Sequence, residues 1–375
     1  MSASGMAEIS TPLLAFTKFF GGSGVSKLPL ESGAQAEFAM GKGSVEVSLI
    51  LDITGSMKEG TRLADMKAAA ADLVNTVVWE DQSEHYAKVA LVPYAAAVNV
   101  GDLATTVRGS IKSGTATTPG SQKYKFTNAE RRAAEKTFSI STCATERTGS
   151  EKFTDQSPTS AKVGLNYPVS GSSNPCPSAQ VVPLTKDKLK LLTAIANYEA
   201  AGSTAGHIGI AWGWYALSPN WSSVFTGESA PASYSKLTEK DRKGAPMLRK
   251  IAVLMTDGEF NTAYCNGVIA KDSGDGSGGD ADHINCNATN SSSEYPGRSS
   301  EYQARALCDA MKAKGIIIYS IGFGSGVADE AKSLLKSCAT EPEKGLHYYM
   351  ATTGDQLKQA FRDIALKMSS LYLSR

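Results

Sequence analysis

The stretch VEVSLILDITGSM, residues 45–57, decides how this chain folds. Val45 to Leu51 has the composition of a β-strand, and it runs directly into a short polar loop that begins at Asp52. From about Thr61, apolar side chains recur at the spacing of an amphipathic helix with one face toward a core. They are Leu63, Met66, Ala70, Leu73, Val74, Val77 and Val78. The stretch therefore predicts a strand–loop–helix unit.

Further strands are expected at residues 89–94, 251–256 and 316–321. The last two are continuous apolar runs, which are typical of parallel strands buried on both faces. Helices are expected near residues 188–198, after the turn at 202–206, and at 355–371. Because strands and helices alternate, we predict an α/β fold with a doubly wound, mostly parallel sheet flanked by helices.

Composition shifts divide the chain. Residues 1–43 are rich in Gly and Ser and are interpreted as a tether. Residues 44–372 form the predicted domain, which two polar stretches interrupt. One is an irregular insertion at 101–180, which is too long for a plain connection, and the other is a polar loop at 263–298.

Charge and motif content exclude several functions. Lys and Arg number 38 against 37 Asp and Glu, a net charge of +1, so an extended nucleic-acid surface is not expected. No run of about 18 apolar residues is present to span a bilayer. Gly55 and Gly60 have the spacing of a phosphate-binding loop, but Thr61-Arg62 stands where that loop needs Lys-Ser or Lys-Thr, so nucleotide binding is not expected either.

Oxygen-bearing side chains cluster where predicted strands end or helices begin. They are Asp52, Thr54, Ser56, Thr204 and Asp257. Carboxyl ends of parallel strands meet at one edge of a sheet, where ligands bind. Two carboxylates and three hydroxyls, without sulfur or histidine, suit Mg²⁺, with Mn²⁺ or Ca²⁺ as alternatives. The competing interpretation makes Asp52, Thr54 and Ser56 caps of the helix near Thr61.

This pattern resembles the metal-ion-dependent adhesion site (MIDAS) of von Willebrand factor type A domains, with Thr54 where many members have serine. Flanking strings resemble the TadG-like proteins of tight-adherence (Flp) pilus assembly. They are residues 92–94, 98–101, 183–185, 205–209, 212–214, 217–219 and 255–262. The resemblance implies an envelope-anchored protein, periplasmic or at the cell surface, that is not an enzyme. Full members usually start with a transmembrane helix, which this sequence lacks.

The six cysteines contain no Cys-x-x-Cys pair, which excludes zinc ribbons and thioredoxin-like motifs. Their positions in polar loops favour disulfides in an exported protein over buried thiols in a cytosolic one. We expect neighbours to pair, as Cys143–Cys176, Cys265–Cys286 and Cys308–Cys338. Residues 1–30 lack the apolar segment of a signal peptide, so we expect that a leader or inner-membrane anchor has been left off this chain.

The functional hypothesis is a metal-dependent adhesion-type domain that captures an Asp or Glu of a protein partner through Mg²⁺. Two alternatives remain: an envelope scaffold whose metal only stabilises the fold, and a surface adhesin for a host or matrix protein. Asp272, Asp275, Asp280 and Asp282 are interpreted as a solvated loop, with a second cation site as the alternative. His207, beside Thr204, is interpreted as a packing or capping residue.

Overall fold

The computed structural model describes most of the chain from residue 43 onward. The described residues are 43–111, 123–125, 135–137, 141–167, 174–242, 244, 246–265, 268–269 and 299–370. They all belong to the unit that begins at Gly41. Except for Gly43, the predicted tether lies outside the described residues.

A six-stranded sheet forms the centre of the described domain, in the order β12-β11-β8-β1-β2-β7. The strands are β1 (Ser44–Asp52), β2 (Ala87–Tyr94), β7 (Val182–Thr185), β8 (Leu248–Thr256), β11 (Ile317–Phe323) and β12 (Tyr348–Ala351). Neighbours pair in parallel except β7, which is antiparallel to β2. The sheet grows outward from β1 in both directions, which is the doubly wound arrangement. The predicted fold class, an α/β fold with a doubly wound, mostly parallel sheet flanked by helices, is confirmed.

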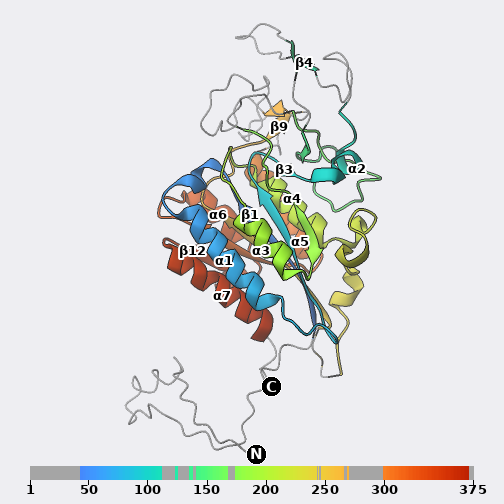
Figure 1. The fold of residues 1–375 in the computed structure, drawn as a ribbon, viewed down its shortest axis with the longest axis vertical. Helices are drawn as coiled ribbons and strands as arrows, with labels where there is room; N and C mark the ends of the chain where they lie inside the picture. Colours follow the sequence, from blue (N-terminus) through green and yellow to red (C-terminus); the bar gives the residue numbers. More distant parts are fainter. Residues whose placement is uncertain are drawn as a thin grey trace, which may run out of the picture. The chain divides into compact units, whose positions relative to one another are not determined.

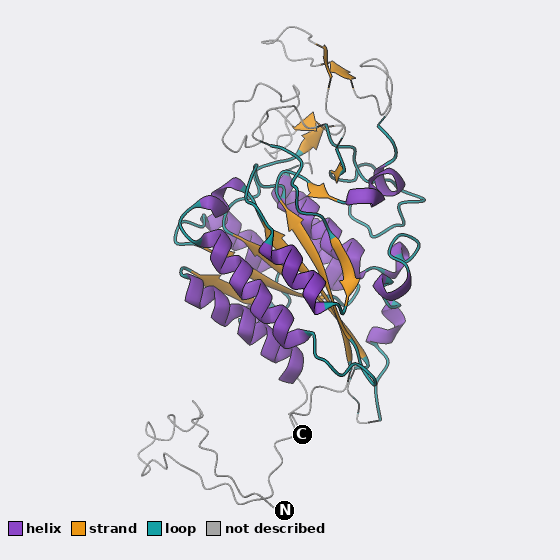
Figure 2. Ribbon diagram, viewed as in Figure 1, coloured by secondary structure: helices purple, strands orange, loops and turns teal. Residues whose placement is uncertain are grey.

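Helices cover both faces of this sheet (Figures 1 and 2). Helices α1 (Arg62–Val77), α3 (Lys188–Ala196) and α7 (Gly354–Ser370) pack on one face. Helices α4 (Gly206–Leu217), α5 (Ser300–Ala313) and α6 (Asp329–Cys338) pack on the other. Strand β1 serves both layers, because Val47, Leu49 and Leu51 contact the first set and Ile50 contacts the second. This alternation is the period-2 pattern of a strand.

Helix α4 lies directly against β1 and β2, and every one of its residues is buried. Its glycines permit this approach. A Cβ at Gly213 would come within 2.3 Å of Ile50, and one at Gly209 within 2.6 Å of the Tyr94 ring. The close packing fixes the start of α4, and with it Thr204, at the carboxyl edge of the sheet.

The remaining elements are short. They are η2 (Gly55–Lys58), β3 (Val98–Asn99), η3 (Gly101–Leu103), α2 (Ala104–Arg108), β4 (Lys123–Lys125), β5 (Glu135–Thr137), β6 (Cys143–Ala144), η5 (Pro219–Trp221), η6 (Gly227–Ser229), η7 (Tyr234–Leu237), β9 (Tyr264–Cys265), β10 (Val268–Ile269) and η9 (Pro342–Lys344). Among the described residues, no helix combines the length and apolar character needed to span a bilayer.

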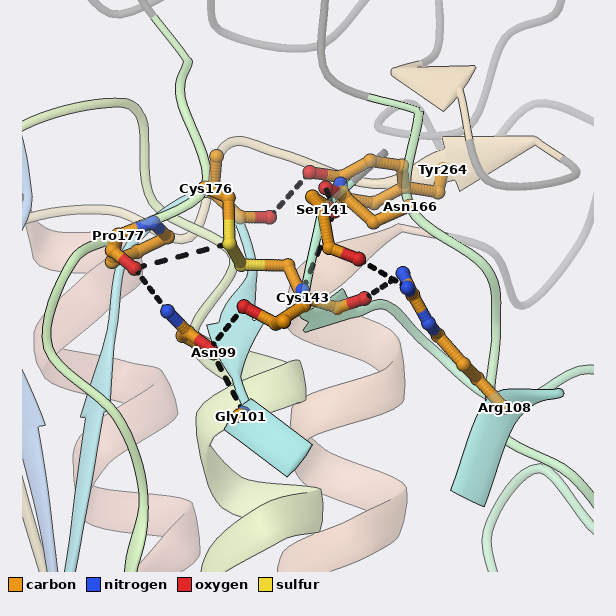
Figure 3. The surroundings of a disulfide bond; sticks show 11 residues. Asn99, Gly101, Arg108, Ser141, Cys143, Asn166, Cys176, Pro177 and Tyr264 are labelled. Atoms are coloured by element: carbon orange, nitrogen blue, oxygen red, sulfur yellow. Dashed lines mark hydrogen bonds between the residues drawn. A yellow bond between two sulfur atoms is a disulfide. The ribbon is translucent and has the colours of Figure 1, made fainter. Parts of the chain in front are cut away.

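The predicted insertion is attached where β2 ends, and Figure 3 shows how part of it is held. Strand β6 pairs antiparallel with β3. The Arg108 guanidinium of α2 donates hydrogen bonds to the backbone oxygens of Ser141 and Cys143. Cys143 is joined to Cys176 by a disulfide with an S–S length of 2.04 Å. These contacts join separate parts of the insertion to one another and to β3.

Two of the three predicted disulfides are confirmed. Besides Cys143–Cys176, Cys308 at one face of α5 is bonded to Cys338 at the end of α6. The third prediction, Cys265–Cys286, involves residue 286, which lies outside the described residues. The four aspartates considered as a second cation site, at 272, 275, 280 and 282, lie outside them too.

Candidate metal centre

Two carboxylates meet where β1 and β8 end. Asp52 is the last residue of β1, and Asp257 directly follows β8. The two strands are paired in parallel and in register, with Leu51 opposite Met255, so their ends lie at the same level. The fold therefore brings together two acids that lie 205 positions apart (257 minus 52) in the sequence.

Asp52 is completely buried and accepts three hydrogen bonds. Its Oδ1 accepts from the Thr54 amide at 2.8 Å, and its Oδ2 from the Thr256 hydroxyl at 2.7 Å and the Tyr94 hydroxyl at 3.3 Å. Tyr94 ends β2, so the side chains around Asp52 come from three neighbouring strands. These bonds fix the carboxylate at the edge of the sheet.

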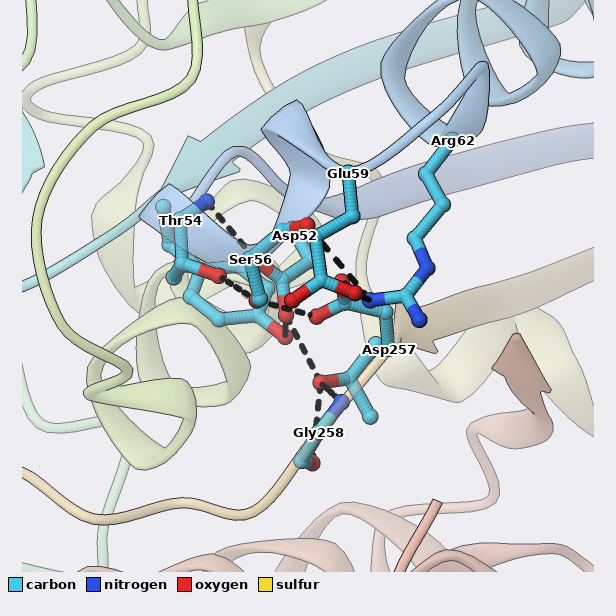
Figure 4. Close-up of polar contacts among 9 residues, drawn as sticks. Asp52, Thr54, Ser56, Glu59, Arg62, Asp257 and Gly258 are labelled. Atoms are coloured by element: carbon cyan, nitrogen blue, oxygen red, sulfur yellow. Dashed lines mark hydrogen bonds and ion pairs between the residues drawn. The ribbon is translucent and has the colours of Figure 1, made fainter. Parts of the chain in front are cut away.

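Asp257 is linked to the loop after β1 by a chain of hydroxyls (Figure 4). Ser56 Oγ donates to Asp257 Oδ1 at 2.6 Å, and it lies 3.0 Å from Thr54 Oγ1. The side-chain oxygens of three predicted ligands, Thr54, Ser56 and Asp257, thus form one hydrogen-bonded chain. The Thr54 hydroxyl makes no cap hydrogen bond to η2, and the N-cap of α1 is Thr61. The alternative, that Asp52, Thr54 and Ser56 cap the helix near Thr61, is therefore wrong.

Thr204 lies in a loop that is attached to both of the others. The Gly55 amide donates to Gly202 O at 2.7 Å, which joins it to the loop after β1. The Thr204 amide donates to Asn261 Oδ1 at 3.0 Å, and Thr204 O accepts from the amides of Asn261 and Thr262. The hydrogen bonds that hold Thr204 run through its backbone amide and carbonyl. The structure thus brings the Thr204 loop to the cluster and leaves the role of its hydroxyl as a prediction.

The site contains more acidic than basic side chains. Burial, together with the nearby Asp257 carboxylate, raises the pKa of Asp52 to about 7, against the opposing hydrogen bonds from Thr54 and Thr256. Burial also raises the pKa of Asp257, while the Ser56 hydroxyl and the Arg62 guanidinium lower it. A cation between these groups would stabilise their charged forms.

Arg62 is part of the site and was not predicted. Its Nη1 lies 3.1 Å from Asp257 Oδ2 and 3.0 Å from Glu59 Oε2. Thr256 and Tyr94, which bind Asp52, were not predicted as site residues either. Their positions in the sequence could have indicated two of these residues. Arg62 opens the helix that follows the Asp52–Ser56 loop, and Thr256 directly precedes Asp257.

The donor set fits a hard divalent cation. It combines two carboxylates with hydroxyls, and oxygen is the ligand atom that Mg²⁺, Mn²⁺ and Ca²⁺ prefer. Among the described residues, no group of three or more His, Cys, Asp or Glu has an arrangement that could hold a metal. A cation bound here would have the hydroxyl oxygens of Thr54 and Ser56 beside the two acids.

His207 contacts residues outside this cluster. It is buried, its Nδ1 lies 2.6 Å from Ser300 Oγ of α5, and its Nε2 is hydrogen-bonded to Glu146 of the insertion. The Glu146 carboxylate also accepts from the Gln303 amide and the Tyr264 backbone. His207 thus joins the insertion to α4 and α5, in agreement with the interpretation of a packing residue.

No protein family and no curated protein matches this sequence. Solved structures do match. The von Willebrand factor domain of the type V pili tip protein Mfa5 from Porphyromonas gingivalis has 14% identity and a TM-score of 0.46, over 89% of this chain and 97% of that one. The pilus adhesin SpaC from Lactobacillus rhamnosus GG has 14% identity and a TM-score of 0.44 over 87% of this chain, which spans 30% of SpaC. Proximal thread matrix protein 1 from the mussel byssus, with a zinc-occupied MIDAS motif, has 13% identity and a TM-score of 0.36, over 87% of this chain and 48% of that one.

Proposed function

We propose that this domain binds a divalent cation, preferentially Mg²⁺. Its ligands would be Asp52, Thr54, Ser56, Thr204 and Asp257. The observation that carries the proposal is the hydroxyl chain from Thr54 through Ser56 to Asp257, beside a second buried carboxylate. Two buried acids with too little positive charge beside them are costly to ionise without a cation. A divalent ion supplies that charge.

The ion would serve binding rather than catalysis. Thr54, Ser56 and Thr204 would supply neutral oxygens, and Asp52 and Asp257 the negative charge. With neutral hydroxyls among its ligands, the ion stays electron-poor and attracts a further carboxylate from outside. We therefore propose that a protein partner presents an Asp or Glu side chain to the site.

The setting of this binding is proposed from the sequence. The strings shared with TadG-like proteins favour a role in pilus assembly, at an envelope or cell-surface location reached through an anchor. The two disulfides agree with an oxidising compartment. If the metal only stabilised the fold, partner binding would survive EDTA. If the protein were a host or matrix adhesin, envelope extract would yield no partner in a pull-down.

Titration calorimetry and thermal unfolding with Mg²⁺ and Mn²⁺ test the metal site. The folded domain has the site and the unfolded chain does not, so at a hundred times the dissociation constant the ion should stabilise the fold by about 2.7 kcal/mol. Asp257→Ala should lose both the binding heat and the metal-dependent shift. Asp329→Ala, which removes an exposed acid of α6, is the matched control and should keep both. If the wild type shows neither effect at millimolar metal, the proposal is wrong.

A further inference from the structure

The Arg62 guanidinium reaches the same carboxylate that the proposed cation needs. Asp257 has both oxygens engaged, Oδ1 by the Ser56 hydroxyl and Oδ2 by Arg62 at 3.1 Å (Figure 4). The Asp257 side chain is fully buried, whereas Arg62 is 23% exposed. Arg62 therefore lies on the solvent side of this carboxylate.

Helix stability does not explain Arg62. It is the first residue of α1, and a cation at a helix N-terminus is disfavoured by the helix dipole. Groups outside α1 offset this unfavourable interaction with the helix dipole. Glu59 Oε2 lies 3.0 Å from the guanidinium, which also packs over the backbone of Gly324, after β11. A Cβ built on Gly324 would lie 3.5–3.6 Å from three guanidinium atoms, so the side chain is held in place by packing as well as by charge.

We propose that Arg62 is a built-in counter-cation that competes with the divalent ion for Asp257 and so lowers the cation affinity of the site. This inference rests on the proposed function. A divalent ion that shares Asp257 with Arg62 meets a fixed positive charge a few ångströms away, and the repulsion is weakly screened because the carboxylate is buried. Arg62 thus sets the metal concentration at which the site fills.

The test is the dissociation constant for Mg²⁺ and Mn²⁺, measured by titration calorimetry at low ionic strength. Arg62→Gln removes the charge and keeps a polar side chain, and we expect it to bind either ion about tenfold more tightly than the wild type. Arg62→Lys keeps the charge and should stay within about threefold of the wild type. Arg362→Gln is the matched control: it removes a guanidinium that pairs with Asp72 on the outer side of α1, and it should leave the constant unchanged.

The outcomes separate this inference from the proposed function. If the wild type binds metal and Arg62→Gln binds it equally or more weakly, the counter-cation role is wrong and the metal site stands. If no variant binds metal, both fail. Should Arg62→Gln not fold, Arg62→Met gives the same reading, because it also removes the charge while keeping a long side chain.

Discussion

The buried charges at the two ends of β1 and β8 differ. Those at the amino ends have opposite signs, and those at the carboxyl ends have the same sign. At the amino ends, Glu46 and Lys250 are register partners, both fully buried, and form an ion pair. Lys250 Nζ also donates to Leu217 O at 2.7 Å, and Glu46 Oε1 accepts from the Tyr86 hydroxyl and the Ala232 amide. At the carboxyl ends, Asp52 and Asp257 carry the same charge, and Arg62 compensates from a partly exposed position.

This difference in charge supports the proposal that a cation binds at the carboxyl ends of the two strands. At the Glu46–Lys250 end, the two charges balance, and each side chain has further hydrogen-bond partners. This end therefore holds the strands together without a ligand. At the Asp52–Asp257 end, burial raises the pKa of both acids, and the charge of Asp257 adds to the rise at Asp52. Perturbed acids gathered at a strand edge are typical of functional sites. The same two strands thus have a structural end and, in the proposed function, a binding end.

The largest effect should come from breaking the balanced end. Lys250→Met leaves Glu46 buried without its cation, and we expect a loss of about 3–5 kcal/mol in the free energy of unfolding. Urea unfolding at neutral pH measures it. The double variant Glu46→Gln/Lys250→Met should recover much of the loss, because no buried charge then remains. A single-variant loss below about 1 kcal/mol would contradict the assignment of a structural pair.

The binding end should make stability depend on pH when EDTA is present. The pKa of Asp52 is about 7 in the fold against 3.8 normally, so between these values the folded state binds a proton that the unfolded state has lost. Stability therefore falls as the pH rises from about 4 to 7, by at most about 1.4 kcal/mol per pH unit, and is constant above that range.

Urea unfolding across pH 4–8 in EDTA checks this pH dependence. Asp52→Asn should flatten the decline, since its side-chain oxygen can still accept from the Thr54 amide while no charge develops. Saturating Mg²⁺ should flatten the wild-type curve as well. A wild-type curve in EDTA that is flat, or that rises over this range, would contradict a raised pKa of Asp52 in the folded state.

A matched pair of tyrosines gives the smallest effects. Tyr86, just before β2, donates to Glu46 at 3.1 Å, and Tyr94, at the end of β2, donates to Asp52 at 3.3 Å. Each Phe variant should lose about 1 kcal/mol of stability at pH 8. In EDTA, Tyr94→Phe should cost less at pH 5 than at pH 8, because its hydroxyl helps the charged form of Asp52. An equal cost at both pH values would contradict the link to Asp52.

Much of the fold could be predicted from local pattern. Residues 45–51, 251–256 and 316–321 were expected as strands, and β1, β8 and β11 follow those bounds within three residues. The short edge strand β12 was not predicted, nor was the antiparallel direction of β7. Edge strands of four residues carry little periodicity, and strand direction depends on the path of the chain outside the strand.

The candidate site also has a part that the sequence predicted and a part that it did not. The alternation of Asp52, Thr54 and Ser56 after a strand is written in consecutive residues, so the sequence alone marked that loop as a source of oxygen ligands. The sequence also marked Asp257, which ends a second apolar run. It determined which residue types stand at the ends of which strands, because burial and strand period leave a direct record in local composition.

Tertiary structure alone decided which of these groups meet. Ser56 reaches Asp257 across 201 residues, Lys250 reaches Glu46 across 204, and Arg62 reaches Asp257 across 195. Each contact depends on β8 lying beside β1 in one register, and a slip by one residue would send every side chain to the other face. Because strand order and register are set by the packing of helices on both faces, no local stretch records them.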